Sequence, residues 1–114
     1  MKHHSSKVRW SFLLLLLFGL TNQLAYSADL NAGKLKANMA CSLCHGANGI
    51  AKIPNAPSLA GQNAQYLQEQ LKAFRSKSRQ NEVMSVIAAP LTDLEIENIS
   101  LWYSAMKVEV TLPN

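Results

Sequence analysis

Apolar residues recur at helical spacing in three segments of the chain, and each pattern predicts an α-helix. In the first segment, from about Asp29 to Cys41, the apolar positions are Ala28, Ala32, Leu35 and Met39. Asp29 is suited to cap the start of this helix. Gly33 lies inside it, and because glycine weakens a helix, it indicates close contact with another helix.

The second helix is predicted from about Asn63 to Ser76. Its apolar face consists of Leu67, Leu71 and Phe74, with Tyr66 alongside. Polar residues at the intervening positions (Gln65, Glu69 and Lys72) are expected to face water.

The third helix carries the clearest start signal. The sequence Thr92-Asp93-Leu94-Glu95 is a capping box, in which the first and fourth residues cap each other's backbone. The apolar stripe that follows is Ile96, Ile99, Trp102, Tyr103 and Met106. Lys107 is expected in the last turn, where a cation suits the helix dipole.

Two long connections separate these helices. Residues 45–62 are punctuated by glycine and proline, namely Gly46, Gly49, Pro54, Pro57 and Gly61. A loop of this length in a small domain usually wraps around something. Residues 76–90 are predicted as a polar loop that becomes apolar at Val83 and Met84. No segment reads as a strand, so the fold class predicted is all-α with long loops.

The first 27 residues have the order of a secretory signal peptide: basic residues, an apolar run at 12–20, then small residues. Cleavage is expected before Ala28 or Asp29, which leaves residues 28–114 as one domain. The apolar run is too short for a spanning helix, so we expect no stable membrane insertion after cleavage. The eight basic and seven acidic residues of 28–114 leave a charge of +1. Nucleic-acid binding by a basic surface is therefore not expected.

The chain's two cysteines form the sequence Cys41-Ser42-Leu43-Cys44-His45. This Cys-x-x-Cys-His spacing is the attachment signature of haem c. In a helical turn, positions i, i+3 and i+4 share one face, so both thiols reach the porphyrin edge and the imidazole reaches the iron. A thioredoxin-like dithiol would need a neighbouring βαβ pattern. A structural zinc site would need further Cys or His ligands, and residues 46–114 contain none.

Methionine is the natural sixth ligand of the iron, because His3 and His4 lie in the leader. Met39 is too close to Cys41 to cross the haem, and Met106 continues an apolar stripe. Met84 stands in the second loop, far enough along the chain to return on the other side. The alternative is that Met84 only fills space and that the sixth site is open. The Pro57 carbonyl is a candidate acceptor for the second ring nitrogen of His45, although a loop proline is also explained by rigidity.

These residues resemble the short class I bacterial cytochromes c, nearest to the c553 type and to the halves of two-haem relatives. The resemblance rests on Cys41-Ser42-Leu43-Cys44-His45-Gly46, Pro57-Ser58-Leu59-Ala60-Gly61-Gln62, Met84 and Leu91-Thr92-Asp93. It implies about four helices wrapped around one covalent haem, with His45 and Met84 as axial ligands and Pro57 as acceptor. It also implies that Gly33 lets the first helix cross the last at Trp102.

The resemblance implies further haem contacts at Leu59, Leu67 and Ile87, and a role for Arg79 in neutralising a haem propionate. A solvated arginine explains Arg79 equally well. The chain departs from the family pattern at Ser76-Lys77-Ser78, where a glycine is usual, at Pro90, and in the bulky pair Trp102 and Tyr103.

The function predicted is that of a periplasmic single-electron carrier, not an enzyme, which exchanges electrons with redox partner proteins. One alternative is a haem-bearing subunit of a larger oxidoreductase. Another is a haem enzyme or sensor with an open sixth site, which would need polar distal groups.

Overall fold

The computed structural model describes residues 27–114, and this part of the chain contains five helices. They are α2 (Leu30–Ala40), α3 (Ser42–His45), α4 (Ala64–Ser76), α5 (Glu82–Ala88) and α6 (Asp93–Ser104). These residues form no strand, which agrees with the predicted all-α class. None of these helices is long and apolar enough to span a bilayer. The predicted signal peptide falls almost wholly outside the described residues.

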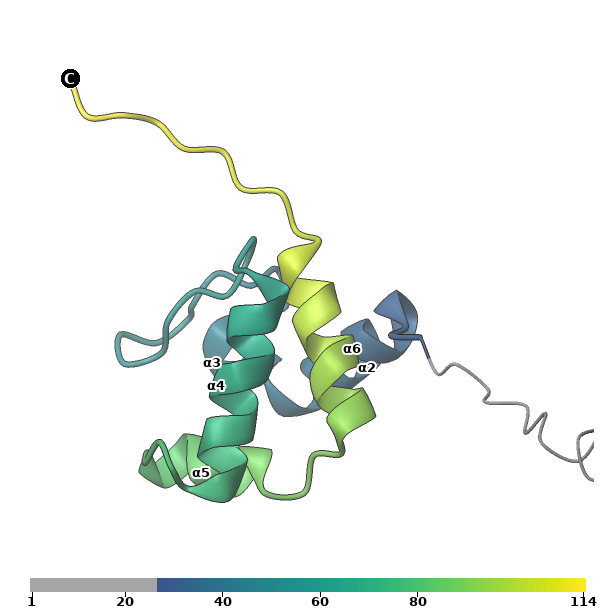
Figure 1. Ribbon diagram of the computed structural model, residues 1–114. Coiled ribbons are helices and arrows are strands. Elements are labelled where there is room, and N and C mark those ends of the chain that lie inside the picture. The colour runs from purple at the N-terminus through teal and green to yellow at the C-terminus, as the bar shows by residue number, and fades with distance from the viewer. Residues whose placement is uncertain (1–26) are drawn as a thin grey trace, which may run out of the picture.

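The helices pack pairwise around one apolar core. Helix α6 packs against both α2 and α4, and α5 packs against α4. Figure 1 shows α4 and α6 side by side, with α5 at the bottom of the view and the 46–63 connection looping out to one side. The buried core consists of Ala37, Leu67, Phe74, Ala88, Leu91, Ile96, Ile99 and Tyr103. Residues after Met106 extend away from this body (Figure 1).

The crossing of α2 and α6 depends on Gly33. A side-chain carbon at this position would collide with the backbone carbonyl of Asn98 and lie 3.1 Å from Trp102 Cβ. The two backbones therefore approach as closely as glycine permits. The predicted contact of Gly33 with the last helix at Trp102 is confirmed.

The predicted apolar face of α2 is wrong. Gly33 and Ala37 are the buried residues of this helix, whereas the Leu35 and Met39 side chains are 65% and 76% exposed. A close helix crossing selects small residues, because large ones would hold the backbones apart. The predicted cap is present, since the Asp29 carboxylate accepts from the Ala32 N–H at 2.8 Å.

Helix α4 has the face that its pattern predicts. Leu67 and Phe74 are buried, and Leu71 packs against the core. Gln65, Glu69 and Lys72 are exposed, as expected. The Asn63 side chain caps the helix by accepting from the Tyr66 N–H at 3.0 Å.

Helix α5 was not predicted, because residues 76–90 read as a loop. Its start is fixed by Asn81, whose side-chain oxygen accepts from Val83 and Met84 N–H groups at 3.1 and 2.9 Å. Met84 therefore lies in the first turn of a helix and not in a loop. The helix has only seven residues and includes the β-branched Val83, Val86 and Ile87, which weaken the helical signal.

Helix α6 begins as predicted and ends earlier than predicted. The capping box is complete: Glu95 N–H donates to Thr92 Oγ1, and Thr92 N–H donates to the Glu95 carboxylate. At the other end, the Gly61 N–H donates to the Tyr103 carbonyl at 2.9 Å. The helix stops at Ser104, so Lys107 is not in its last turn and Met106 packs on the core from outside the helix.

Lys77 lies in the segment Ser76-Lys77-Ser78, where the resemblance described above would place a glycine. It ends α4 in the left-handed conformation, with φ 63° and ψ 14°. Within residues 27–114 it is the single non-glycine residue with positive φ. A side chain in this region strains the backbone, and glycine does not.

Replacing Lys77 by glycine is therefore expected to stabilise the protein by about 0.5–1 kcal/mol. Thermal unfolding followed by circular dichroism would show a Tm increase of a few degrees. Lys72→Gly is the matched control. Lys72 lies inside α4, where glycine should lower stability by about 1 kcal/mol. A lower Tm for Lys77→Gly would contradict the strain argument.

Glu95 links the α6 cap to α2. Its carboxylate accepts from Lys36 Nζ at 2.7 Å, and this bond, with that from the Thr92 N–H, lowers its pKa. A carboxylate with a lowered pKa adds stability above its ordinary value near 4.3, and this stability is lost as the pH falls through the lowered value.

Glu95→Gln should therefore be less stable than the wild type at pH 7, and the difference should shrink below about pH 4. Glutamine can still accept at the cap, so the change isolates the charge. Guanidinium unfolding at several pH values would measure it. Lys36→Met alone should lower the free energy of unfolding at pH 7 by a similar amount. Adding Lys36→Met to Glu95→Gln should cause little further loss, and fully additive losses would show that the two side chains do not interact.

Candidate functional site

The Cys41-x-x-Cys44-His45 sequence forms a single helical turn. Cys41 ends α2 and precedes α3, and its carbonyl accepts from the N–H groups of Cys44 and His45 at 3.3 and 3.0 Å. Positions i, i+3 and i+4 therefore share a face. Leu43, between the cysteines, is highly exposed, as expected of a residue that points away from the site. Both thiols are free, with no disulfide between them.

His45 is held in one orientation. Its side chain is buried, and Nδ1 lies 2.8 Å from the Pro57 carbonyl oxygen. Because a carbonyl only accepts, Nδ1 carries the proton and donates it. Nε2 is then left with a free lone pair, and no described residue hydrogen-bonds to it. This is the tautomer that a metal-ligating histidine requires.

The 46–63 connection is an ordered loop that brings Pro57 to His45. The Lys52 N–H donates to the Cys44 carbonyl at 2.8 Å, which ties the loop to the cysteine turn. The Gly49 carbonyl accepts from both Leu59 and Ala60 N–H groups, at 2.7 and 3.0 Å. Gly49 has a φ of 74°, and a Cβ there would collide with Ala60. These hydrogen bonds order the loop and so hold the Pro57 carbonyl in position to accept from His45.

The environment of Cys41 does not suit a redox dithiol. Burial raises the pKa of its thiol to about 11, whereas reactive cysteines have lowered values. The residues described contain no strand on which a thioredoxin-like site could be built. They also hold no group of three or more Cys, His, Asp or Glu residues placed to bind a metal ion.

Tyr103 is a neighbour of Cys41 that the sequence did not single out. It is fully buried in the core against which Cys41 packs. Burial raises the pKa of its phenol, and the nearby Cys41 thiol contributes to this rise. The apolar stripe predicted that Tyr103 is in the core, but only the helix crossing brings it near Cys41.

The other predicted contacts lie around the same core. Leu67 belongs to the core itself, and Leu59 and Met84 are partly buried against it. Ile87 is partly buried on α5, one turn after Met84. Arg79 is exposed, with its guanidinium bonded to Gln70 and 4.6 Å from the Phe74 ring centroid. The roles of these residues toward a haem remain predictions.

These residues fit a covalently attached haem. Two free thiols and an imidazole with a free Nε2 share one face of a turn, which is the donor set for two thioether links and one axial ligand. The neighbouring core offers apolar contacts and the Met84 thioether. No second histidine is present in residues 27–114.

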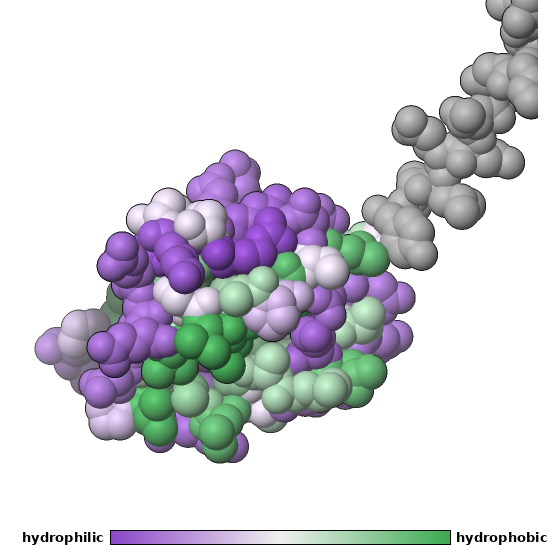
Figure 2. Space-filling view, turned by 90° about the horizontal axis from the view of Figure 1, so that it is seen from below, coloured by the Kyte–Doolittle hydropathy of each residue, from purple (hydrophilic) through white to green (hydrophobic). Residues whose placement is uncertain are grey.

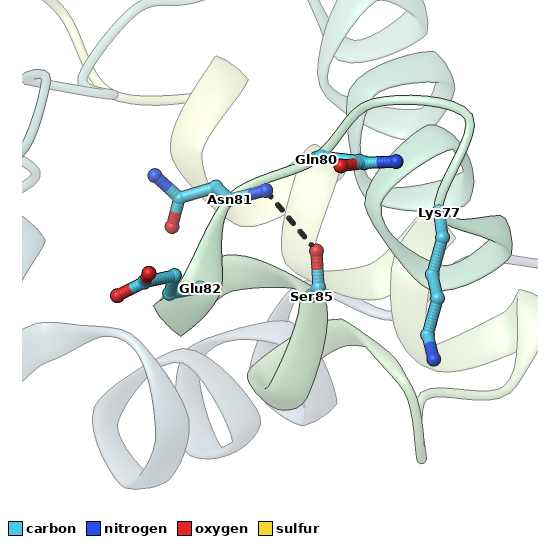
Figure 3. A pocket seen from close by; sticks show the side chains of 5 residues that line it. All are labelled: Lys77, Gln80, Asn81, Glu82 and Ser85. Carbon is cyan, nitrogen blue, oxygen red and sulfur yellow. Dashed lines mark hydrogen bonds between the residues drawn. The ribbon is translucent and has the colours of Figure 1, made fainter.

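A separate depression lies between the end of α4 and the start of α5. It is lined by Lys77, Gln80, Asn81, Glu82 and Ser85. Figure 3 shows these side chains around the turn, with the Asn81 N–H directed to Ser85 Oγ at 3.2 Å. It contains neither thiol nor imidazole and is open to solvent, so it does not contribute to the haem site.

Comparisons with known proteins agree with this geometry. The family model described as Cytochrome c matches residues 30–102. Cytochrome c4 of Thiocapsa roseopersicina is 42% identical over 76 residues, covering 67% of this chain and 39% of that protein. Cytochrome c-554(548) of Halomonas halodenitrificans is 34% identical over 84 residues, covering 71% of this chain and all of that protein.

A protein of Stutzerimonas stutzeri named thiosulfate dehydrogenase electron acceptor is 41% identical over 75 residues, covering 65% of this chain and 35% of that protein. The crystal structure of reduced recombinant cytochrome c4 from Pseudomonas stutzeri superposes with a TM-score of 0.66 at 33% identity, covering 74% of this chain and 48% of that one. The chain thus spans half or less of the length of these cytochrome c4 relatives.

Proposed function

This chain belongs to the cytochrome c family and carries one covalently attached haem c, and on that basis we propose that it is a periplasmic single-electron carrier and not an enzyme. Residues 1–27 would be the export signal. Cleavage before Ala28 would leave intact the Asp29 N–H, which donates to Asn98 Oδ1 at 2.7 Å. A single-domain carrier of this kind is supported by cytochrome c-554(548), whose whole length this chain covers.

In this proposal Cys41 and Cys44 would hold the haem as thioethers, and His45 would ligate its iron. When bound, the haem supplies a one-electron Fe(III)/Fe(II) couple. Met84 provides the distal thioether, which favours the reduced state and raises the potential. Leu59, Leu67 and Ile87 would line the haem and exclude water, and Arg79 would balance propionate charge.

The observation that carries the proposal is the bond between His45 Nδ1 and the Pro57 carbonyl, 2.8 Å long. It fixes the ring before any electron arrives, so little has to reorganise when the charge of the site changes. A ligand set that stays in place in both oxidation states is what fast outer-sphere transfer needs. The second histidine that an open-site haem enzyme would use is missing from residues 27–114.

Part of the surface is suited to brief docking with redox partners. The face seen from below, on which α5 lies, carries a band of apolar side chains bordered by hydrophilic ones (Figure 2). Val83 and Val86 on α5 are both exposed, and both are near Met84 in sequence. An apolar patch near Met84 would let a redox partner dock without either protein having to desolvate charged side chains.

A second candidate is a fixed electron-transfer subunit of a larger oxidoreductase. It is favoured by the relative named thiosulfate dehydrogenase electron acceptor and by the greater length of that protein. Size measurement of the native complex in a periplasmic extract distinguishes the two functions. A free carrier elutes at the size of the single domain, and a subunit elutes with its enzyme.

The test of the proposed function is a redox titration of the holoprotein purified after export. We expect one reversible one-electron transition, and a reduced spectrum that carbon monoxide does not change, because both axial positions are filled. A mature N-terminus at Ala28 or Asp29 would support export. Rapid carbon monoxide binding by the wild type would refute the six-coordinate carrier and favour the sensor or enzyme class.

A further inference from the structure

Helix α6 carries the described side-chain atoms that are buried without a hydrogen-bond partner: Ser100 Oγ, Trp102 Nε1 and the Tyr103 hydroxyl. A buried hydroxyl without a partner costs about 1–3 kcal/mol, and phenylalanine would fill the Tyr103 site without that cost. Tyr103 is 0% exposed, so bulk solvent does not reach the hydroxyl. A tyrosine at this position is therefore explained only if its hydroxyl gains a hydrogen-bond partner in the haem-bound protein.

The polar group that the structure brings close to this hydroxyl is the Cys41 thiol, since each contributes to the other's pKa. Cys41 is partly buried against the core that contains Tyr103, and each side chain is part of the other's immediate environment. In this structure the Tyr103 hydroxyl has no partner in full hydrogen-bond geometry, so the pair is close but not bonded. Either group could then donate to the other, so no single arrangement is imposed.

Thioether formation would remove this ambiguity. A thioether sulfur has no hydrogen and keeps its lone pairs, so it can only accept. The Tyr103 hydroxyl would then be the sole donor of the pair. Tyr103 lies on α6, whose close crossing with α2 depends on Gly33.

We propose that the Tyr103 hydroxyl donates a hydrogen bond to the Cys41 sulfur once that sulfur is a haem thioether, and that this bond raises the reduction potential. The inference rests on the proposed function, since it takes Cys41 as a haem attachment point. A donor at the sulfur withdraws electron density from the porphyrin edge and so favours the electron-rich reduced state. Tyr103 is thus a positioning residue that acts on the haem through Cys41.

The experiment compares Tyr103→Phe with the wild type, both as exported holoproteins, by spectroelectrochemical titration. Loss of one weak hydrogen bond should change the redox equilibrium constant by about two- to fivefold toward the oxidised state. Tyr66→Phe is the matched control, because it removes the hydroxyl of an exposed tyrosine on α4. A shift in Tyr103→Phe no larger than that in Tyr66→Phe would overturn the proposal.

A second measurement is decided on the wild type, with the variant only as a control. In resonance Raman spectra, transfer of the wild type to D2O should shift a C–S stretching band, because the donor hydroxyl exchanges its proton; the shift should be absent in Tyr103→Phe. An isotope-insensitive band in the wild type would overturn the proposal even if the potential changed. Failure of the proposed function looks different: the wild type would then lack covalent haem or a reversible one-electron transition.

Discussion

Met84→Ala is expected to open the sixth coordination position of the haem iron. Alanine removes the thioether and offers no other ligand, and residues 27–114 contain no second histidine to replace it. Since the thioether favours the reduced state, the midpoint potential should fall by about 0.1–0.3 V, within the ~0.8 V range that axial ligands cover. The reduced variant should also bind carbon monoxide, which the wild type should not.

The chain supplies two methionine controls for this experiment. Met39 is exposed on α2, and Met39→Ala should leave both the potential and the carbon monoxide response unchanged. Met106 packs against the core, and Met106→Ala should lower stability by about 2–3 kcal/mol with the spectrum intact. If Met106→Ala opened the sixth position and Met84→Ala did not, the proposed ligand would be wrong.

The position of Met84 illustrates what sequence patterns leave out. Its separation from His45 and its place off any apolar stripe were enough to select it, but its local structure was predicted wrongly. Helix α5 is nucleated by the Asn81 side chain and has only seven residues. A short helix of this kind is stabilised by packing against α4, a tertiary effect that local propensity does not report.

Features fixed by adjacent residues were predicted well. The capping box at Thr92 and Glu95 and the Asp29 cap each depend on side chains three residues or fewer from the amides they bind. The Cys41-Cys44-His45 face follows from the geometry of one helical turn. The structure also contains the hydrogen bond from His45 to Pro57, twelve residues away; the family resemblance implied this bond, and loop composition alone could not decide it.

Features fixed by distant residues were predicted poorly. The apolar positions predicted for α2 were Ala28, Ala32, Leu35 and Met39, and the structure turns Leu35 and Met39 to solvent instead. At the end of α6, the Tyr103 carbonyl accepts from the N–H of Gly61, more than forty residues earlier in the chain. Tyr103 was predicted as a core residue from its apolar stripe, but its proximity to Cys41 depends on how α2 and α6 pack and was not predicted.

Gly33→Ala should show how far the fold depends on the α2–α6 crossing. Alanine is a better helix former than glycine by about 1 kcal/mol, so an isolated α2 would gain stability. In the protein, the added carbon would collide with the Asn98 backbone carbonyl. Because backbone yields less than a side chain, we expect a net loss of about 3 kcal/mol or more, a large fraction of the 5–15 kcal/mol typical of a domain.

Guanidinium unfolding of the holoproteins would measure this loss, with Gly61→Ala as the control. Gly61 has positive φ, but its added carbon would come no closer than 3.1 Å to the Val108 side chain and 3.3 Å to the Met106 carbonyl, so that variant should lose only about 1 kcal/mol. Trp102→Ala should not rescue Gly33→Ala, because the nearest obstacle is the Asn98 carbonyl and not the indole. Rescue by Trp102→Ala would show instead that side-chain packing, and not backbone contact, requires glycine at this crossing.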